Sequence, residues 1–171
     1  MYWNISVADF CERMRVENDR FWDAYREEKR KKLNLSRAEV ISLAAIVNEE
    51  SKKVDERPRV AGVYLNRLRK GMKLQADPTV VYAMKRKAND VDLVIRRVLY
   101  KDLQINSPYN TYRKRGLPPG PITMPDVSSI DAVLDAESHN YLYFVADPNK
   151  VGYHLFAITY KQHLANRDIY I

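Results

Sequence analysis

The feature that most constrains this sequence is a short apolar helical segment that ends in two adjacent acids. Ser36 is followed three residues later by Glu39, which is the capping-box signature of a helix start. Apolar residues then recur on one side of a 3.6-residue wheel, at Val40, Leu43, Ala44 and Val47. The segment therefore predicts a helix over residues 36–50 that is buried along this stripe.

The two acids at the end of this helix differ in direction. Glu50 lies seven residues after Leu43 and so points along the apolar side, whereas Glu49 turns away from it. Desolvation raises the pKa of a carboxyl group and makes it a competent general acid near neutral pH. Periodicity alone leaves a second interpretation open, in which Glu50 is a helix-end carboxylate paired with Arg57 or Arg59.

The chain before this segment also has a helical pattern. Ser6, with Asp9 three residues later, is a helix start, and apolar residues recur at helical spacing from there to the basic cluster at residues 29–32. This pattern predicts one long amphipathic helix within residues 1–35. The basic cluster is expected to be a solvated helix end, where positive charge complements the helix dipole.

The remainder of the chain predicts further helices and one hairpin. The expected helices lie at residues 55–70, 77–84, 92–100, 128–136 and 160–167. Asp77 is expected to cap its helix, with Pro78 as the first helical residue. Aromatic and β-branched runs at 141–146 and 153–157 flank a turn, which is typical of a hairpin. The predicted fold class is therefore α+β, mostly helical with a small antiparallel sheet, in a single domain over residues 1–171.

A proline-rich segment at residues 107–125 predicts an ordered loop instead of a regular element. Loops of this length usually carry function. Its aromatic residues, Tyr109 and Tyr112, have less reason to be core than the tyrosines of the hairpin, and flat aromatic faces suit sugar rings. Polar side chains suited to sugar hydroxyl and acetamido groups are Asn66, Gln75 and Asn110.

Composition excludes several classes of protein. With 46% hydrophobic and 30% charged residues, the chain is an ordinary globular sequence, and no apolar run approaches the ~18 to 20 residues of a membrane span. The single cysteine, Cys11, excludes an internal disulfide and a multi-cysteine zinc site. The N-terminus carries no secretion signal, so the protein is either cytosolic or an excised fragment.

The formal net charge of +7 favours a polyanionic partner, either nucleic acid or an anionic cell envelope. No nucleic-acid-binding motif supports the first candidate, and glycine-rich phosphate loops are absent from the sequence. The three histidines, His139, His154 and His163, lack the spacing of metal ligands. We therefore expect no metal, no cofactor and no nucleic acid.

Several long motifs, in order, carry a family resemblance. They are residues 43–50 (LAAIVNEE), 59–68 (RVAGVYLNRL), 72–80 (MKLQADPTV), 107–112 (SPYNTY), 116–122 (GLPPGPI), 141–147 (YLYFVAD) and 154–156 (HLF). Together they closely resemble the endolytic murein transglycosylases, also called YceG-like proteins. The resemblance covers residues 36–171.

The resemblance implies cleavage of the β-1,4 bond between N-acetylmuramic acid and N-acetylglucosamine, with a 1,6-anhydromuramoyl end as product. It maps the family's catalytic glutamate onto Glu50, at the end of a lysozyme-like active-site helix, and places Asn48 where the family has a further acid. A single acid suffices if the muramoyl C6 hydroxyl is the internal nucleophile, whereas ordinary hydrolysis needs two carboxylates. The expected substrate-binding residues are Asn66, Gln75, Asp77, Tyr109, Asn110 and Tyr112.

Two other functions stay open, namely a lysozyme-like hydrolase and a peptidoglycan-binding module without activity. The resemblance also implies a location on the outer face of the inner membrane, reached through a membrane span and a LysM-like region that are expected to be missing here. The expected partners are peptidoglycan glycan strands, with the cell-wall synthesis machinery as a further candidate.

Overall fold

The computed structural model describes residues 4–170 of the 171-residue chain, and this part is mostly helical with one two-stranded antiparallel sheet. The helices are α1 (Val7–Phe21), α2 (Ala24–Leu33), α3 (Arg37–Glu50), α4 (Arg57–Arg69), α5 (Asp77–Ala88), α6 (Val127–Leu134) and α7 (Tyr160–Tyr170). The strands are β1 (Tyr143–Ala146) and β2 (His154–Ala157). The predicted fold class is confirmed.

The described part of the chain forms two compact units, residues up to 36 and residues from 37 onward. The first unit holds two helices, so the prediction of one long helix is wrong. α1 ends at Phe21, and Asp23 then caps α2 by accepting a hydrogen bond from the backbone N–H of Arg26. A capping aspartate whose backbone is extended starts a new helix instead of continuing the old one. The predicted cap at Ser6 is confirmed.

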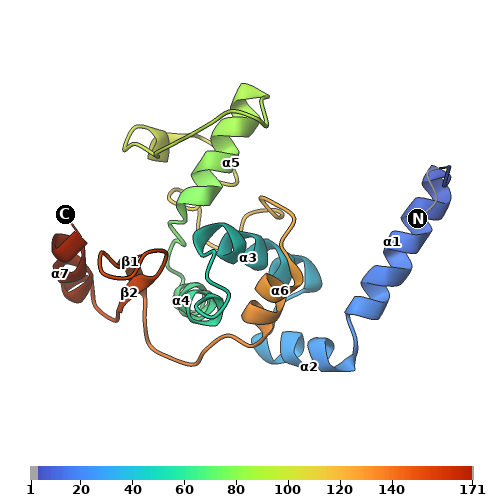
Figure 1. Ribbon diagram of the computed structural model, residues 1–171, viewed down its shortest axis with the longest axis horizontal. Helices are drawn as coiled ribbons and strands as arrows, with labels where there is room; N and C mark the ends of the chain where they lie inside the picture. The colour runs from blue at the N-terminus through green and yellow to red at the C-terminus, as the bar shows by residue number, and fades with distance from the viewer. Residues whose placement is uncertain (1–3, 171) are drawn as a thin grey trace. The chain divides into compact units, whose positions relative to one another are not determined.

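Helix α3 is the centre of the second unit, where it packs against α4, α5 and α6 (Figure 1). Every residue from Ser42 to Val47 is buried, which is wider than the single stripe that the sequence predicts. The hydroxyl of Ser42 is satisfied inside the helix, because it donates to the carbonyl oxygen of Ala38 at 2.8 Å. Because α3 is enclosed on several sides, the position of its last turn is fixed by packing.

Helix α4 supports the chain that leads into the hairpin. A Cβ atom added to Gly62 would lie 2.6 Å from the carbonyl oxygen of Glu137 and 2.6 Å from Nε2 of His139, so only glycine permits this approach. One turn later, Asn66 Nδ2 donates to the carbonyl oxygens of His139 and Tyr141. The hairpin pairs Tyr143 with Ala157 and Ala146 with His154, and α7 packs against both strands.

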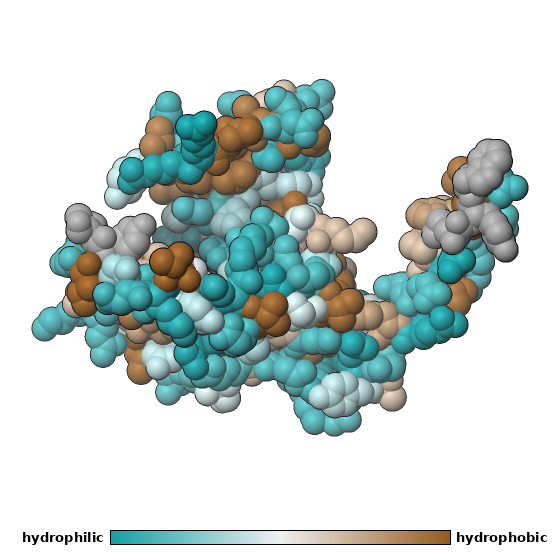
Figure 2. Space-filling view, viewed as in Figure 1, coloured by the Kyte–Doolittle hydropathy of each residue, from teal (hydrophilic) through white to brown (hydrophobic). Residues whose placement is uncertain are grey.

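Two local expectations around α5 differ from the structure. The N-cap of α5 is Ala76, and Asp77 is already helical, so the Asp77 carboxylate is free for another partner. Residues 92–100 form no helix, because their irregular apolar spacing creates no face that can be buried. Val94 is 79% exposed and Tyr100 90% exposed. Hydrophobic side chains accordingly lie on the surface over α5 and the chain beyond it (Figure 2).

The segment over residues 107–125 is an irregular loop without helix or strand, as predicted. It is anchored by buried polar side chains. Thr111 Oγ1 accepts a hydrogen bond from the backbone N–H of Ala76 and lies 2.8 Å from Thr79 Oγ1, which ties the loop to the start of α5. The loop is therefore a fixed wall of the molecule.

Candidate active site

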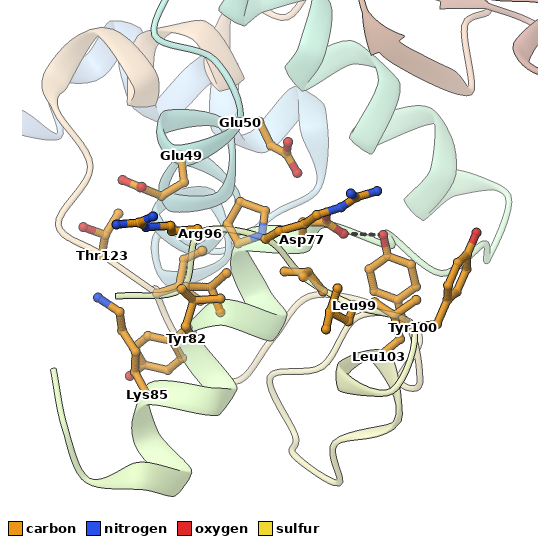
Figure 3. A pocket seen from close by; sticks show the side chains of 17 residues that line it. Glu49, Glu50, Asp77, Tyr82, Lys85, Arg96, Leu99, Tyr100, Leu103 and Thr123 are labelled. Atoms are coloured by element: carbon orange, nitrogen blue, oxygen red, sulfur yellow. Dashed lines mark hydrogen bonds between the residues drawn. The ribbon is translucent and has the colours of Figure 1, made fainter. Parts of the chain in front are cut away.

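A cavity of about 840 Å³ opens between the end of α3 and the first turns of α5 (Figure 3). Glu49 and Glu50 lie on its α3 side, and Asp77, Tyr82 and Lys85 lie on its α5 side. The other walls come from residues 95–100 and from the loop residues Tyr112, Ile122 and Thr123. Segments far apart in the sequence thus enclose one space.

The two acids of α3 have different surroundings, as the sequence predicts. Figure 3 shows their carboxylates pointing to different sides, with Glu50 directed toward Asp77. Glu49 is exposed and interacts with Asn48 Nδ2 at 3.0 Å and with Lys52 Nζ at 3.6 Å. Glu50 is half-buried and accepts a hydrogen bond from Tyr64 Oη at 2.7 Å. Of the two acids, Glu50 is therefore the more desolvated.

Burial raises the pKa of Glu50 to about 7, and desolvation is the largest cause. The hydrogen bond from Tyr64 lowers the pKa, and the negative charge of Asp77 raises it. The positive charges of His154 and Arg67 lower it by smaller amounts. A carboxyl group with a pKa near 7 holds its proton in a substantial fraction of molecules at neutral pH, as general-acid catalysis requires.

The alternative interpretation, in which an arginine pairs with Glu50, does not hold. Arg57 Nη1 instead binds both carboxylate oxygens of Asp126, at 2.8 and 2.9 Å, across to the start of α6. Arg59 Nε binds Glu137 at 2.9 Å. Both arginines that the sequence offered as partners are thus committed to other carboxylates.

A second carboxylate lies in the same cavity. Asp77 Oδ1 accepts a hydrogen bond from Tyr112 Oη at 2.5 Å, which is the dashed line in Figure 3. Burial and this hydrogen bond raise the pKa of Tyr112 well above its ordinary value, so its hydroxyl remains a donor. The sequence singled out both residues, but not their contact with each other or the effect of Asp77 on Glu50.

The remaining predicted residues lie outside the lining of the cavity, in structural roles. Asn110 is fully buried, and its Nδ2 donates to the carbonyl oxygens of Leu103 and Ile105 at 2.9 Å. Its Oδ1 accepts from the backbone N–H of Tyr112. This placement differs from the expectation that Asn110 faces a glycan. A buried amide that binds the carbonyls of the segment before the loop and a backbone N–H within it fixes the loop and thereby positions Tyr112.

The side chains of Asn66 and Gln75 also form hydrogen bonds within the protein. Asn66 anchors the chain before the hairpin, as described above. Gln75 is exposed and has a left-handed backbone with φ of 56°, and its Oε1 accepts from Arg67 Nη1 at 3.2 Å. Tyr109 lies behind the cavity wall, where its ring centroid is 4.6 Å from that of Tyr82. Of these residues, Gln75 alone is strongly exposed.

Tyr64 and Arg67 of α4 are the residues that sequence reasoning missed. Tyr64 is 2% exposed and lies among buried aliphatic residues of α4, so helical periodicity does not distinguish it from a core residue. A buried tyrosine hydroxyl needs a polar partner, which is the signal that could have found it. Arg67 is 7% exposed and donates to the backbone carbonyls of Leu74 and Leu142, which places its charge beside the site.

Among residues 4–170, no group of three histidine, cysteine or acidic side chains is arranged to hold a metal ion. Within the same described part, no helix is long and apolar enough to cross a membrane.

A half-buried carboxylic acid with a raised pKa, which accepts a hydrogen bond from a tyrosine and lines a cavity, is a candidate general acid–base site. The chain matches the sequence profile of the YceG-like family over residues 1–169, so the match includes the N-terminal region that the motifs left out. The protein belongs to the YceG-like family.

Similar proteins agree with this assignment. The chain is 39% identical over 166 residues to an endolytic murein transglycosylase of Bacillus subtilis, covering 97% of this chain and 43% of the relative. It is 35% identical over 117 residues to an endolytic murein transglycosylase of Streptococcus pneumoniae, covering 68% of this chain and 21% of the relative. The chain thus spans less than half the length of these curated relatives.

A solved structure shares the fold. The crystal structure of a yceG-like protein from Listeria monocytogenes matches with a TM-score of 0.78 at 34% sequence identity. The match covers 96% of this chain and 50% of the other.

Proposed function

We propose that this chain is the catalytic region of an endolytic lytic transglycosylase. It cleaves the β-1,4 bond between N-acetylmuramic acid and N-acetylglucosamine within peptidoglycan strands and leaves a 1,6-anhydromuramoyl end. The observation that carries the proposal is Glu50, a carboxylic acid with a pKa near 7 on a cavity of about 840 Å³. The two relatives named endolytic murein transglycosylases support the choice of substrate.

The mechanism needs one acid in two steps. Because Tyr64 donates to Glu50 Oε1, the proton of the neutral acid resides on Oε2, from which it passes to the glycosidic oxygen as the bond breaks. The muramoyl C6 hydroxyl then attacks the anomeric carbon and returns its proton to Glu50. No water enters the product, and the acid is regenerated. Intramolecular attack adds the gain in effective molarity that a bound nucleophile provides.

A lysozyme-like hydrolase is the second candidate, and one observation favours it. Asp77 supplies a second carboxylate in the same cavity, close enough for its charge to raise the pKa of Glu50. Hydrolases use such a second carboxylate as nucleophile or as base for water. In this chain Asp77 already accepts the Tyr112 hydroxyl, which weakens it in either role. A binding module without activity would have no use for the raised pKa of Glu50.

The test is digestion of purified peptidoglycan strands, followed by mass spectrometry of the fragments. An anhydro end is lighter by one water than the reducing end that a hydrolase leaves. Glu50→Gln is expected to abolish product formation while binding and folding persist, because glutamine is nearly isosteric but cannot exchange a proton. Glu49→Gln is the matched control and should retain activity, since Glu49 is exposed and turned away.

Reducing ends from the wild-type chain would assign the hydrolase reaction and give Asp77 a direct role. Full activity of Glu50→Gln would remove Glu50 from the mechanism. Since the protonated form of Glu50 starts the reaction, the rate is also expected to fall as the pH rises through about 7.

We further propose that the protein acts on the outer face of the inner membrane, on glycan strands and alongside the cell-wall synthesis machinery. The net charge of +7 suits an anionic envelope. Binding to purified sacculi, compared with binding to duplex DNA over a salt series, tests this proposal. Preferential binding to DNA with a steep salt dependence would contradict it.

A further inference from the structure

Three cationic side chains line the cavity, and the mechanism above does not use them. Lys85, Arg96 and Arg97 line the cavity together with the acids of α3 and α5. Figure 3 shows Lys85 and Arg96 on the same side as Glu49, away from the side to which Glu50 points. Two of the three cations therefore lie away from the direction in which Glu50 points.

These cations lack carboxylate partners in the part of the chain that the structure describes. No ion pair joins Arg96 or Arg97 to an acid of residues 4–170, and both side chains are exposed. Lys85 Nζ donates only to the backbone carbonyl oxygen of Val91, at 2.8 Å, which neutralises no charge. Unpaired guanidinium groups on a cavity wall are available to an anionic ligand.

The acids of the cavity do not cancel this charge. Glu49 interacts with Lys52 and with the amide of Asn48. Asp77 accepts a hydrogen bond from the neutral hydroxyl of Tyr112, and its negative charge acts on Glu50, which carries its proton in many molecules because its pKa is about 7. Within the part of the chain that the structure describes, none of these acids forms an ion pair with Lys85, Arg96 or Arg97.

The proposed substrate brings negative charge to this place. A glycan strand whose stem peptides are attached is uncharged along its sugars, because the lactyl carboxyl of each muramic acid is tied up as an amide. The peptide itself carries free carboxylates and branches from the muramic acid next to the bond that Glu50 attacks. A strand bound for cleavage therefore extends a carboxylate-bearing peptide into the surroundings of the same cavity.

We propose that Lys85, Arg96 and Arg97 form a subsite for the carboxylates of the stem peptide, so that the site selects peptide-bearing strands. This inference rests on the proposed function for the position of the strand. Arg96 and Arg97 present planar guanidinium groups suited to carboxylates, and Lys85 adds a point charge from a rigid helix.

The test measures binding in place of turnover, so that it does not depend on the reaction. The chain with Glu50→Gln is titrated against fluorescent glycan strands that carry intact stem peptides, and against the same strands after conversion of their peptide carboxylates to neutral amides. Adding Arg96→Gln and Arg97→Gln is expected to weaken binding to intact strands by about 3- to 10-fold, as loss of two exposed charge pairs predicts. Binding to amidated strands should not change, and the difference should shrink at high salt.

A matched control removes two positive charges elsewhere. Lys70 and Lys161 are exposed and lie outside the cavity lining, so Lys70→Gln with Lys161→Gln should leave the preference for intact strands unchanged. Strands stripped of peptide by an amidase, which expose only the lactyl carboxylate, should bind both the arginine variant and its parent weakly and equally.

Equal weakening on intact and amidated strands would overturn the subsite, and so would an equal loss in the lysine control. If the arginine substitutions weaken binding to stripped strands by the same factor as binding to intact strands, the cations bind the lactyl carboxylate. That result would overturn a role for the stem peptide. If the wild-type chain leaves intact strands uncut, the proposed function fails, while the binding comparison still decides the subsite.

Discussion

At the scale of single residues, the chemistry depends on how buried polar groups are satisfied. Glu50 receives one hydrogen bond, from Tyr64, and is otherwise desolvated, so its pKa rises. Asn110 donates to the carbonyl oxygens of Leu103 and Ile105, just before the 107–125 loop, and accepts from the backbone N–H of Tyr112. Glu50 is therefore available for proton exchange, whereas Asn110 stabilises the loop that lies beside it.

The raised pKa of Glu50 predicts a pH-dependent cost in stability. Between the ordinary value of 4.5 and about 7, the folded state holds this proton more tightly than the unfolded state. Stability from this group is therefore present at low pH and is lost as the pH rises through that window. Glu50→Gln should unfold at nearly the same free energy as wild type near pH 4.5 and be more stable by about 1–3 kcal/mol near pH 8.

Chemical denaturation at the two pH values measures this difference. Glu49→Gln is the control, because it removes an exposed carboxylate from the neighbouring position, and it should change the free energy of unfolding by less than about 0.5 kcal/mol. A Glu50→Gln variant without added stability near pH 8 would show that burial does not disfavour the charged form of Glu50.

Asn110→Ala is expected to destabilise the protein by about 2–4 kcal/mol, because it removes a buried amide and leaves two part-buried carbonyls and one part-buried N–H without their partner. Thermal unfolding measures the loss. Asn106→Ala is the control, since Asn106 is exposed on the neighbouring loop surface, and its melting temperature should stay close to wild type. An unchanged melting temperature for Asn110→Ala would return Asn110 to the surface role that the sequence suggested.

At the scale of elements, α4 joins the acid-bearing helix to the hairpin. Its Tyr64 contacts the end of α3, and its Asn66 and Arg67 hold the chain at residues 139–142. Gly62 permits that chain to lie directly against the helix. Helix α4 thus positions both Tyr64, the hydrogen-bond partner of Glu50, and the sheet, so the geometry of the site depends on how α4 packs.

Gly62→Ala tests this close approach. Alanine favours a helix over glycine by up to about 1 kcal/mol, so the substitution would stabilise α4 if there were room. The predicted contacts of 2.6 Å instead force backbone to move, and we expect a net destabilisation of about 1–3 kcal/mol in thermal or chemical unfolding. Gly120→Ala is the control, because its added Cβ would meet only Tyr109 Oη, at 3.6 Å. A more stable Gly62→Ala would contradict the packing described.

At the scale of the whole molecule, the second unit contains the complete cavity. Its walls come from α3, α5, residues 95–100 and the 107–125 loop, all of which lie after residue 36. The aliphatic core lies there as well, from Val40 to Ala157. No residue among 4–36 is part of the cavity lining.

Residues 37–171 are accordingly expected to fold alone and to retain the acid. Near-UV circular dichroism should show one cooperative thermal transition, since the unit keeps its own core. Carboxyl-resolved NMR should give a Glu50 pKa that matches that of the full chain. A fragment without fixed aromatic signals would show that residues before 37 are required for packing of the second unit.

The sequence alone determined those features of the fold that depend on residues close together along the chain. Helical periodicity predicted α3 and the different directions of Glu49 and Glu50, and aromatic runs predicted the hairpin. Two of the predicted helices were wrong, each because of a local feature of the sequence. A capping aspartate broke the long N-terminal helix, and the 92–100 segment had apolar residues without a face to bury.

Tertiary structure alone decided which groups surround the acid. Tyr64, Asp77 and Tyr112 lie 14, 27 and 62 positions after Glu50, too far for any periodicity to bring their hydroxyl and carboxylate groups to it. The burial of Asn110 could not be predicted either, because a polar residue in a proline-rich loop has the same sequence signature whether it faces solvent or the backbone carbonyls of the preceding segment. Direction on a helix is set by spacing along the chain, whereas desolvation, and with it the pKa, is set by what packs against the helix from elsewhere.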